Sequence, residues 1–264
     1  MNKKISISLI ISTYNWPVAL DLILLSIKNL SEMPNEVIVA DDGSGEETKK
    51  LIENAAINFP VPLKHIWHED TGWNKTTILN KAIKESKSDY IVQIDGDVIL
   101  HTHFIKDHKK FAEPNTFLRG GRTMLSDLKT KEVISSRRIK FGPLSSGISK
   151  RLNAVRIPLL AKFACTKEES SKDVLGCNFS FWKSDFIKVN GYDNEFFGWG
   201  HEDEELAARF VNSGLYKKNL KFAGVAYHLY HKKQAKELAE KHWEIIKRTN
   251  SENVVYCKSG INDL

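Results

Sequence analysis

Short apolar segments alternate with helix-like segments along the first hundred residues, and this alternation most constrains the fold. The predicted strands cover residues 5–12, 36–41, 63–68 and 90–95, and the predicted helices cover 17–30, 46–59 and 74–86. Strands that are joined through helices lie parallel in one sheet with helices on its faces. We therefore expect an α/β protein whose ligands bind beyond the carboxyl ends of its strands.

The composition is that of a globular protein, and it argues against several other classes. The 264 residues are 41% hydrophobic, which suffices for one large α/β domain or two small ones. The three cysteines are widely spaced and form no Cys-x-x-Cys pair, which indicates a reducing compartment and argues against a zinc site. The N-terminal apolar run is too short for a signal peptide, and no stretch approaches the roughly 20 apolar residues of a membrane helix. We expect a soluble, cytoplasmic protein.

The second half of the chain is less regular, with loops rich in Gly, Ser and basic residues. Residues 176–193 predict a strand, a short helix and a glycine turn. Acidic residues in a first turn and a glycine stop predict a helix over 201–214, and a last helix is expected near 233–248. The expected organisation is two halves of one domain followed by a helical tail, with the boundaries 1–115, 116–232 and 233–264.

The net charge of +6 is concentrated in residues 137–172 and 232–248. Nucleic acid is not an expected partner, because neither segment interleaves aromatic and basic residues as a base-stacking surface does. An anionic membrane surface fits the 137–172 segment, and so does a phosphorylated acceptor. A solvated basic face without a partner is the remaining alternative.

Polar clusters follow three of the predicted strands. Asp95 and Asp97 flank a glycine after a buried strand, and two such carboxylates can share a hard cation. A β-turn that favours Asp-Gly for its backbone alone is the alternative. The ring of Tyr14 could stack on a base and Asp42 could accept a hydrogen bond from it, unless both stretches only cap helices.

Several motifs together resemble family 2 glycosyltransferases of the GT-A fold. They are SLIISTYNWP, VIVADDGS, HEDTGWNKTTILNKAI and YIVQIDGDVIL. The later stretch CNFSFWKSDFIKVNGYDNEFFGWGHEDEELAARF, followed by AYHLYH, is similar to a galactosyltransferase-type C-terminal segment. That segment also occurs in bacterial chondroitin polymerases, β-1,4-galactosyltransferases and polypeptide GalNAc-transferases. The resemblance covers residues 5 to about 231, and it makes 1–115 the nucleotide-sugar half and 116–232 the acceptor and catalytic half.

The resemblance implies a donor site at the ends of the first strands. Ser12 and Tyr14 would meet the uracil, with Asn15 beside them. Asp42 would accept the N3–H of the uracil. Lys75 would lie near the donor, although relatives often have arginine at this position.

The same resemblance implies the remaining donor and metal contacts. Asn80 would also lie near the donor, Asp95 would sit by the ribose, and Asp97 would bind the metal that bridges the diphosphate. His231 would complete the metal site, with His228 or Asp95 as alternative ligands, and imidazole suits Mn²⁺ alongside carboxylate. The alternative for the two histidines is a surface or stacking pair.

The segment FFGWGHEDEEL would form the wall where donor sugar and acceptor meet. Trp199 and Gly200 would pack against a sugar, and Glu202 would hold its hydroxyls. Asp203 would be the general base, and Glu204 would orient the acceptor. A solvated helix start that favours acids through the macrodipole is the alternative interpretation of these residues.

Two further residues of this segment have other expected roles. Glu205 is assigned to the solvated face of the helix, where its replacement would change little. His201 stands where relatives usually have a second glycine, which affects the local loop shape.

The activity implied by the resemblance is inverting, metal-dependent transfer from a UDP-sugar, with Mn²⁺ or Mg²⁺ as cofactor. A hexose or N-acetylhexosamine, with Gal or GalNAc favoured, would pass to a glycan or lipid-linked glycan in bacterial surface polysaccharide or lipopolysaccharide synthesis. Such an enzyme could lie peripherally at the inner face of the membrane. A nucleotidyltransferase is one alternative, but no Gly-rich phosphate loop follows the first strand. A non-catalytic sugar-binding module on the same fold is the other.

Overall fold

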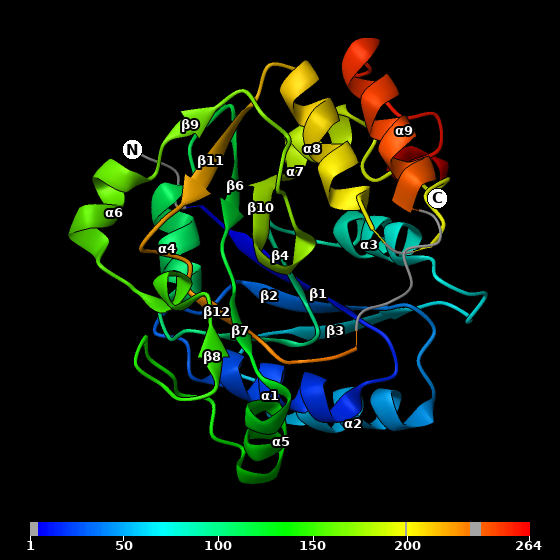
Figure 1. The fold of residues 1–264 in the computed structure, drawn as a ribbon. Helices are drawn as coiled ribbons and strands as arrows, with labels where there is room; N and C mark the ends of the chain where they lie inside the picture. Colours follow the sequence, from blue (N-terminus) through cyan, green and yellow to red (C-terminus); the bar gives the residue numbers. More distant parts are fainter. Residues whose placement is uncertain (1–4, 199, 233–238) are drawn as a thin grey trace.

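The computed structural model describes residues 5–198, 200–232 and 239–264, and an eight-stranded sheet runs through it (Figure 1). In spatial order its strands are β3 (Leu63–Trp67), β2 (Glu36–Asp41), β1 (Ile7–Thr13), β4 (Tyr90–Asp95), β10 (Phe179–Trp182), β6 (Thr116–Gly120), β11 (Tyr216–Leu220) and β9 (Lys167–Glu168). The first four are parallel. The antiparallel β10 joins them to β6 and β11, which are parallel to each other, and β9 is antiparallel to β11.

The sheet is covered on both faces because side chains alternate along each strand. Ile7, Leu9 and Ile11 of β1 face a core that includes α1, whereas Ile10 faces a second core that includes α3. Every residue of β1 is buried, as expected for a parallel strand between two helical layers. In Figure 1, α1, α2 and α5 lie on one side of the sheet, and α3 and α8 lie on the other.

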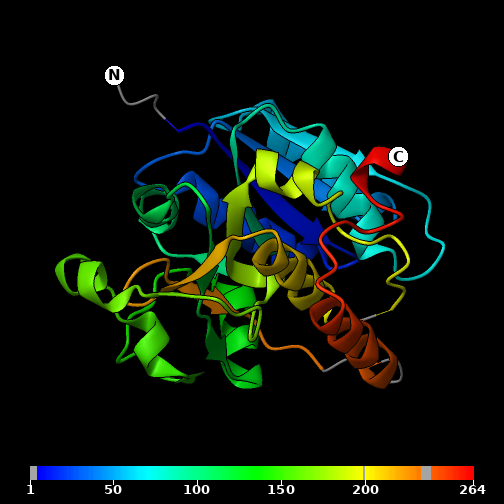
Figure 2. The same cartoon turned by 90° about the horizontal axis from the view of Figure 1, so that it is seen from above.

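The helices connect the strands and continue beyond the sheet. Their bounds are α1 (Pro17–Lys28), α2 (Glu46–Ile57), α3 (Lys75–Lys84), α4 (Phe104–Phe111), α5 (Asp127–Ser136), α6 (Pro158–Ala164), α7 (Lys183–Lys188), α8 (Glu202–Asn212) and α9 (Ala239–Ser251), with single 3₁₀ turns at Arg151–Ala154, Gly176–Asn178 and Ile261–Asp263. Helix α9 packs against α8 in both views (Figure 1, Figure 2). Within the described ranges, no helix is both long and apolar enough to cross a membrane.

A second, smaller sheet lies beside the first and brings the two halves of the chain together. Its strands are β5 (Val98–Leu100), β12 (Ala226–His228), β7 (Thr123–Leu125) and β8 (Ile148–Ser149). β12 is antiparallel to β5, and the register places His228 opposite Val98. The N–H of Leu229 donates to the carbonyl of Asp97 at 2.9 Å. This pairing places the segment that contains His228 and His231 next to Asp97, which follows β4.

The α/β class and the order of elements in the first hundred residues are confirmed. The predicted strands 36–41 and 90–95 have the observed bounds of β2 and β4, and the three helices each end two residues before their predicted C-terminal limits. The strand, short helix and glycine turn within 176–193 are β10, α7 and the turn at Gly191. Strands from both predicted halves share the large sheet, and the division into halves stays a prediction. Of the last predicted helix, residues 233–238 lie outside the described residues.

Candidate active site

The carboxyl ends of β1 and β4 meet at one edge of the sheet and carry the first polar group of the site. Ser12 pairs with Asp95 in register, and its hydroxyl donates to the Asp95 carboxylate at 2.9 Å. The N–H of Gly96 donates to the Ser12 carbonyl at 2.7 Å. A Cβ at Gly96 would lie 3.0 Å from that carbonyl oxygen, so a side chain there would crowd β1. The Asp95-Gly96-Asp97 turn is thus fastened to the end of β1.

An exposed ring lies near a buried carboxylate beyond β1 and β2. Tyr14 is 48% exposed, and its hydroxyl donates to Asp70 at 2.8 Å. The Asp42 carboxylate is buried and held by His68 Nε2 at 2.7 Å and by the N–H of Asn74 at 3.0 Å. Burial raises the pKa of Asp42 despite these contacts. The assignment of this ring and this carboxylate to a base-binding site stays a prediction.

Three other residues shape this part of the site. Asn15 has a left-handed backbone (φ 44°), and its side-chain oxygen accepts from the N–H of Gly45 at 2.9 Å. Asn15 thus ties the end of β1 to the loop after β2. His68 and Asp70, which hold Asp42 and Tyr14, were not predicted, because no local motif marks a side chain whose partner lies across a loop.

Lys75, at the start of α3, links Asp95 at the end of β4 to the acidic helix α8. Its Nζ lies 3.0 Å from Asp95 Oδ1 and 3.3 Å from Glu202 Oε1. Burial by itself lowers the pKa of Lys75, but the carboxylates of Asp95 and Glu202 outweigh burial and raise it well above its ordinary value. The Lys75 charge in turn lowers the pKa of Asp95 against the effect of burial. Lys75 and Asp95 therefore form an ion pair that is charged near neutral pH.

Asn80 is placed differently from the expected donor contact. Its side chain is completely buried on α3, and its Nδ2 donates to the Tyr192 carbonyl at 2.8 Å and to Asn194 at 2.9 Å. Its oxygen accepts from the N–H of Tyr192 at 2.9 Å. Asn80 thus fixes the loop that carries Tyr192, because a buried amide must have partners for both of its polar atoms.

Asp97, His228 and His231 form a cluster that could hold a metal ion. The Nε2 atoms of His228 and His231 lie 3.5 Å and 3.3 Å from Asp97 Oδ2, and the three ligand atoms lie within 4.8 Å of one another. Nδ1 of His228 donates to the Leu229 carbonyl at 2.6 Å, and Nδ1 of His231 donates to the Lys232 carbonyl at 2.9 Å. Both protons are therefore on Nδ1, and both Nε2 lone pairs are free for a cation.

The donor set fits a divalent cation. Asp97 Oδ1 is buried without a hydrogen-bond partner, and burial together with the charge of Asp95 raises the pKa of Asp97 to about 8. Burial lowers the pKa of His228 to about 4, which keeps that imidazole neutral. One carboxylate and two imidazoles suit Mn²⁺ and related divalent ions. Both histidines face Asp97, whereas Asp95 is engaged by Ser12 and Lys75.

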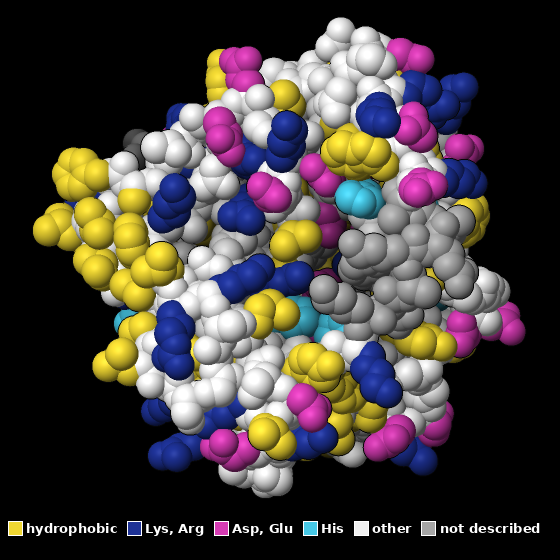
Figure 3. All heavy atoms as spheres, in the orientation of Figure 1, with side chains coloured by type: hydrophobic (Ala, Val, Ile, Leu, Met, Phe, Trp, Pro, Cys, Tyr) yellow, Lys and Arg dark blue, Asp and Glu magenta, His cyan; other side chains and the backbone are white. Residues whose placement is uncertain are grey.

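Arg122, between β6 and β7, adds a positive charge that sequence reasoning missed. Its Nη1 donates to the Cys177 sulfur at 3.0 Å, and its Nε is buried without a partner. Burial lowers its pKa, but Cys177 and the charges of Asp95 and Asp97 raise it above its ordinary value. A buried guanidinium beside carboxylates is prepared to bind an oxyanion. Figure 3 shows Lys or Arg side chains beside histidines in the central hollow of this face.

Asp203, in the first turn of α8, is held by three donors. Oδ1 accepts from the hydroxyl of Tyr192 at 2.7 Å and from Gln93 at 3.3 Å, and Oδ2 accepts from the N–H of Gly176 at 2.6 Å. A Cβ at Gly176 would lie 2.6 Å from Asp203 Oδ1, so only glycine permits this approach. Burial, offset by Lys75 and reinforced by Glu202, raises the pKa of Asp203 to about 6. Gln93, Tyr192 and Gly176 come from three other elements and were not predicted.

The other residues of the acidic segment have separate partners. Glu202 is buried against Lys75, and Glu204 accepts from His201 Nδ1 at 3.1 Å. Gly200 (φ 109°) and His201 (φ 70°) both have left-handed backbones. Glycine adopts this conformation most readily, so the left-handed backbone at His201 is unfavourable for a residue with a side chain. Trp199 lies outside the described residues.

The expectation that Glu205 faces solvent is wrong. Its side chain is buried, and its two oxygens accept from Arg209 Nε at 2.8 Å and Nη2 at 2.7 Å. Arg209 is itself completely buried and donates to the carbonyls of Val189 and Gly191. Residues four apart share a helix face, and here that face points into the core between α8 and the preceding turn.

Comparison with known proteins identifies the chain's relatives. Residues 8–167 match the family described as Glycosyl transferase family 2, and residues 160–232 match the description "N-terminal domain of galactosyltransferase". A chondroitin synthase of Pasteurella multocida is 26% identical over 249 residues, which cover 86% of this chain. The match covers only 25% of that relative's length.

Solved structures share the fold. TarS of S. aureus covers 97% of this chain with a TM-score of 0.63 at 13% identity, over 67% of its own chain. A mannosyltransferase of Pyrobaculum calidifontis, solved with GDP-Man and Mn²⁺, covers 95% with a TM-score of 0.58 at 16% identity, over 63% of its own chain. The α/β architecture is the GT-A fold that the sequence resemblance implied. The match over residues 8–167, which is more than half of the chain, shows that the chain belongs to glycosyltransferase family 2.

Proposed function

We propose that this chain is an inverting, metal-dependent glycosyltransferase that uses a UDP-sugar. The observation that carries the proposal is the pairing of two sites at one sheet edge. One is the Asp97, His228 and His231 cluster, and the other is the immobilised carboxylate of Asp203. The contacts of Lys75 with Asp95 and Glu202 connect the two sites.

On the donor side, the Tyr14 ring stacks on the uracil and the Asp42 carboxylate accepts its N3–H. Asp97, His228 and His231 would hold Mn²⁺ or Mg²⁺, which acts as a Lewis acid and offsets the negative charge of the diphosphate. The Arg122 guanidinium, whose Nε has no partner, binds a diphosphate oxygen from the other side.

On the acceptor side, one carboxylate oxygen of Asp203 takes the proton of the attacking hydroxyl. Tyr192, Gln93 and Gly176 fix its orientation, and its pKa near 6 keeps it unprotonated at neutral pH while basic enough to accept a proton. The acceptor oxygen then bonds to the anomeric carbon as the bond to the UDP oxygen breaks. A single displacement inverts that carbon, and no covalent intermediate with the protein is needed.

The transferred sugar is proposed to be a hexose or N-acetylhexosamine, with Gal or GalNAc favoured. This choice is supported by the galactosyltransferase match of residues 160–232 and by the similarity to a chondroitin synthase. The acceptor is proposed to be a glycan or lipid-linked glycan in bacterial surface polysaccharide or lipopolysaccharide synthesis. We further propose a cytoplasmic location, peripheral at the inner face of the membrane.

The test combines a donor screen with one substitution. UDP release is measured with UDP-Gal, UDP-GalNAc, UDP-Glc and UDP-GlcNAc, with and without candidate glycan acceptors. Asp203→Asn keeps the shape of the side chain but removes the basic oxygen, so transfer should fall by at least about 10²-fold. Donor affinity, measured by calorimetry, should stay within a few fold because Asp203 does not contact the nucleotide.

The control is Asp127→Asn on the solvent side of α5, which should leave transfer unchanged. Full activity of a folded Asp203→Asn protein would disprove the assignment of the base. Donor binding without release of UDP under any condition would favour the sugar-binding module instead.

A further inference from the structure

Large apolar side chains are concentrated on one stretch of the surface. Six such side chains in the described part of the chain are at least 70% exposed, and four of them lie between residues 144 and 163. These four are Leu144 (93%), Leu152 (78%), Leu159 (70%) and Phe163 (78%). The other two, Ile57 and Leu128, lie singly on α2 and α5. Soluble monomers rarely expose apolar clusters of this kind without a partner.

The segments that carry the four side chains are held together. Arg151 Nη1 donates to the Pro143 carbonyl at 2.6 Å, which ties the turn of Leu152 to the loop of Leu144. The N–H of Ile157, just before α6, donates to the Phe222 carbonyl at 3.0 Å, which anchors α6 to the body of the protein. Figure 3 shows hydrophobic side chains gathered over α6 at the left edge, with Lys or Arg beside them. These segments form what we call the apolar edge, residues 143–163.

The segment that contains the apolar edge carries only positive charges. Residues 137–167 contain eight Lys or Arg and no Asp or Glu. The rest of the chain has 31 basic and 33 acidic residues, so the whole positive excess comes from this segment. Arg137, Arg156 and Lys167 are paired with acids from elsewhere. Within the described residues, Arg138 and Lys140 have no ion pair.

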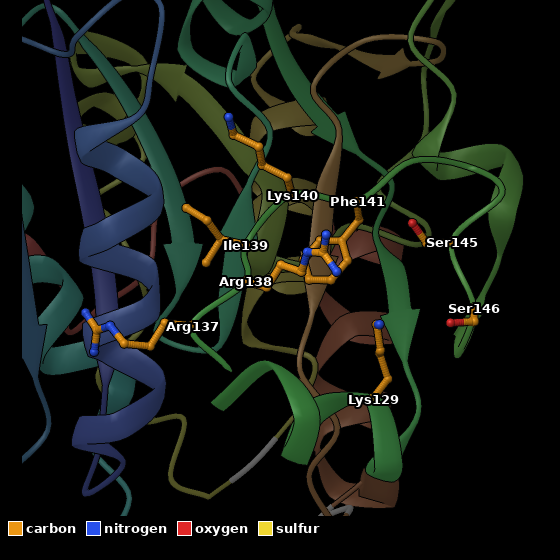
Figure 4. A pocket seen from close by; sticks show the side chains of 8 residues that line it. All are labelled: Lys129, Arg137, Arg138, Ile139, Lys140, Phe141, Ser145 and Ser146. Carbon is orange, nitrogen blue, oxygen red and sulfur yellow. The ribbon is translucent and has the colours of Figure 1, made fainter. Parts of the chain in front are cut away.

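A basic pocket of about 580 Å³ lies at one end of the apolar edge. Its lining includes Lys129, Arg138, Phe141, Ser145 and Ser146 (Figure 4). Figure 4 shows the two serine hydroxyls and Lys129 on one side and Arg138 nearer the other. Cationic groups and hydroxyls suit a phosphate, and the exposed Leu144 precedes the two serines directly.

We propose that the apolar edge and the basic pocket dock this protein on a membrane that contains anionic lipids. The exposed leucines and Phe163 enter the boundary between headgroups and acyl chains, while the cations contact lipid phosphates. Charge argues against a second copy of the chain as the occupant, because two surfaces of the same sign repel each other. A polyanion without an apolar part would leave the leucines in water.

Docking in this way is independent of the proposed transfer reaction, since it needs neither donor nor metal. It would serve that reaction, because the apolar edge and the central hollow with its histidines are visible on the same face (Figure 3). A lipid-linked acceptor at the membrane surface would then lie beside the acceptor half of the site.

Vesicle co-sedimentation of the full chain tests the proposal. We expect binding to vesicles that contain phosphatidylglycerol at low salt, little binding to phosphatidylcholine alone, and release at high salt. The double variant Leu159→Ser/Phe163→Ser should bind at least about tenfold less, from the lost insertion of two apolar side chains. Ile57→Ser, which changes an equally exposed side chain on α2, is the control and should bind normally.

The contribution of the positive charges to vesicle binding is tested with a second pair of variants, one test and one control. Arg138→Gln/Lys140→Gln should bind roughly 25-fold less, at about fivefold for each charge near an anionic surface. Lys49→Gln/Lys50→Gln lowers the net charge equally on α2 and should bind normally. Absence of binding at low salt would overturn the proposal, and so would equal losses in the test and control variants. A protein dimer that Leu159→Ser/Phe163→Ser converts to monomer would show that a second copy covers this surface instead.

Discussion

Replacing Glu205 by glutamine should destabilise the protein strongly while leaving its chemistry intact. The Glu205 carboxylate is 3% exposed and accepts two hydrogen bonds from Arg209, and Thr249 lies at 3.3 Å from the same carboxylate. Arg209 has no exposed surface, and its remaining donors reach the Val189 and Gly191 carbonyls. Glu205→Gln therefore leaves a buried guanidinium without its counter-charge.

The magnitude follows from burial. A pair on the surface would contribute at most about 1 kcal/mol, but removing one partner of a fully buried pair costs about 3–5 kcal/mol. The amide oxygen of glutamine can still accept one of the two hydrogen bonds, so we expect about 3 kcal/mol. At roughly 2–4 °C per kcal/mol for a chain of this size, the melting temperature should fall by about 10 °C.

Urea unfolding followed by circular dichroism measures the loss in free energy of unfolding. Glu244→Gln, which breaks an exposed pair with Lys247, is the matched control and should cost less than about 1 kcal/mol. Glu205→Leu/Arg209→Met removes both charges and should be less destabilised than Glu205→Gln, because no uncompensated charge remains. Equal stability of Glu205→Gln and the wild type would refute the buried ion pair with Arg209 and would indicate that Glu205 faces solvent.

The remaining predictions concern the chemistry. The pKa of Asp203 is raised to about 6, so its basic form is lost as the pH falls through that value. Below pH 6, kcat/KM should therefore drop about tenfold for each pH unit. A kcat/KM that stays constant down to pH 5 would contradict the role of Asp203 as the base. Asp97→Ala should abolish transfer, EDTA should do so reversibly, and full activity in EDTA would exclude a metal-dependent reaction. His228→Ala and His231→Ala should each weaken Mn²⁺ binding in calorimetry by at least about tenfold, because both Nε2 atoms face Asp97; an unchanged affinity in either variant would remove that histidine from the site.

The sequence predicts best those strands and helices whose pattern of apolar residues lies within one continuous segment. The apolar runs of β1, β2 and β4 are buried on both faces, and the helices between them carry their own spacing and end signals. Because parallel strands end at the same edge, Ser12, Asp95 and Asp97 could be brought together before any contact was known. The position of these residues at one edge of the sheet was predictable for that reason.

The contacts that the sequence did not predict join distant segments. The antiparallel β10 enters between β4 and β6, and this pairing places Gly176 and Gln93 around Asp203. A one-dimensional pattern carries no signal for such pairing, because each partner is separated from the others by tens of residues. Arg122 was missed for the same reason, since only the pairing of β7 with β12 brings it to the metal cluster.

Four adjacent carboxylates can coexist at the start of α8 because the helix turns each one toward a different environment. Successive side chains are rotated by about 100°, so the four acids do not share one patch of surface. Each then meets its own partner, and these partners are Lys75 for Glu202, Tyr192, Gln93 and the Gly176 N–H for Asp203, His201 for Glu204 and Arg209 for Glu205.

Only one of the four carboxylates is buried without a cation of its own. Glu202 and Glu205 each lie within ion-pair distance of a cation, which is Lys75 for Glu202 and Arg209 for Glu205. Asp203 is held by neutral donors, and its pKa is the one that rises to about 6. A carboxylate that is ionised at neutral pH, fixed in place and without a counter-ion is the group best able to take a proton. The local pattern of acids marks a helix start, but the difference in partners is what distinguishes the base from its neighbours.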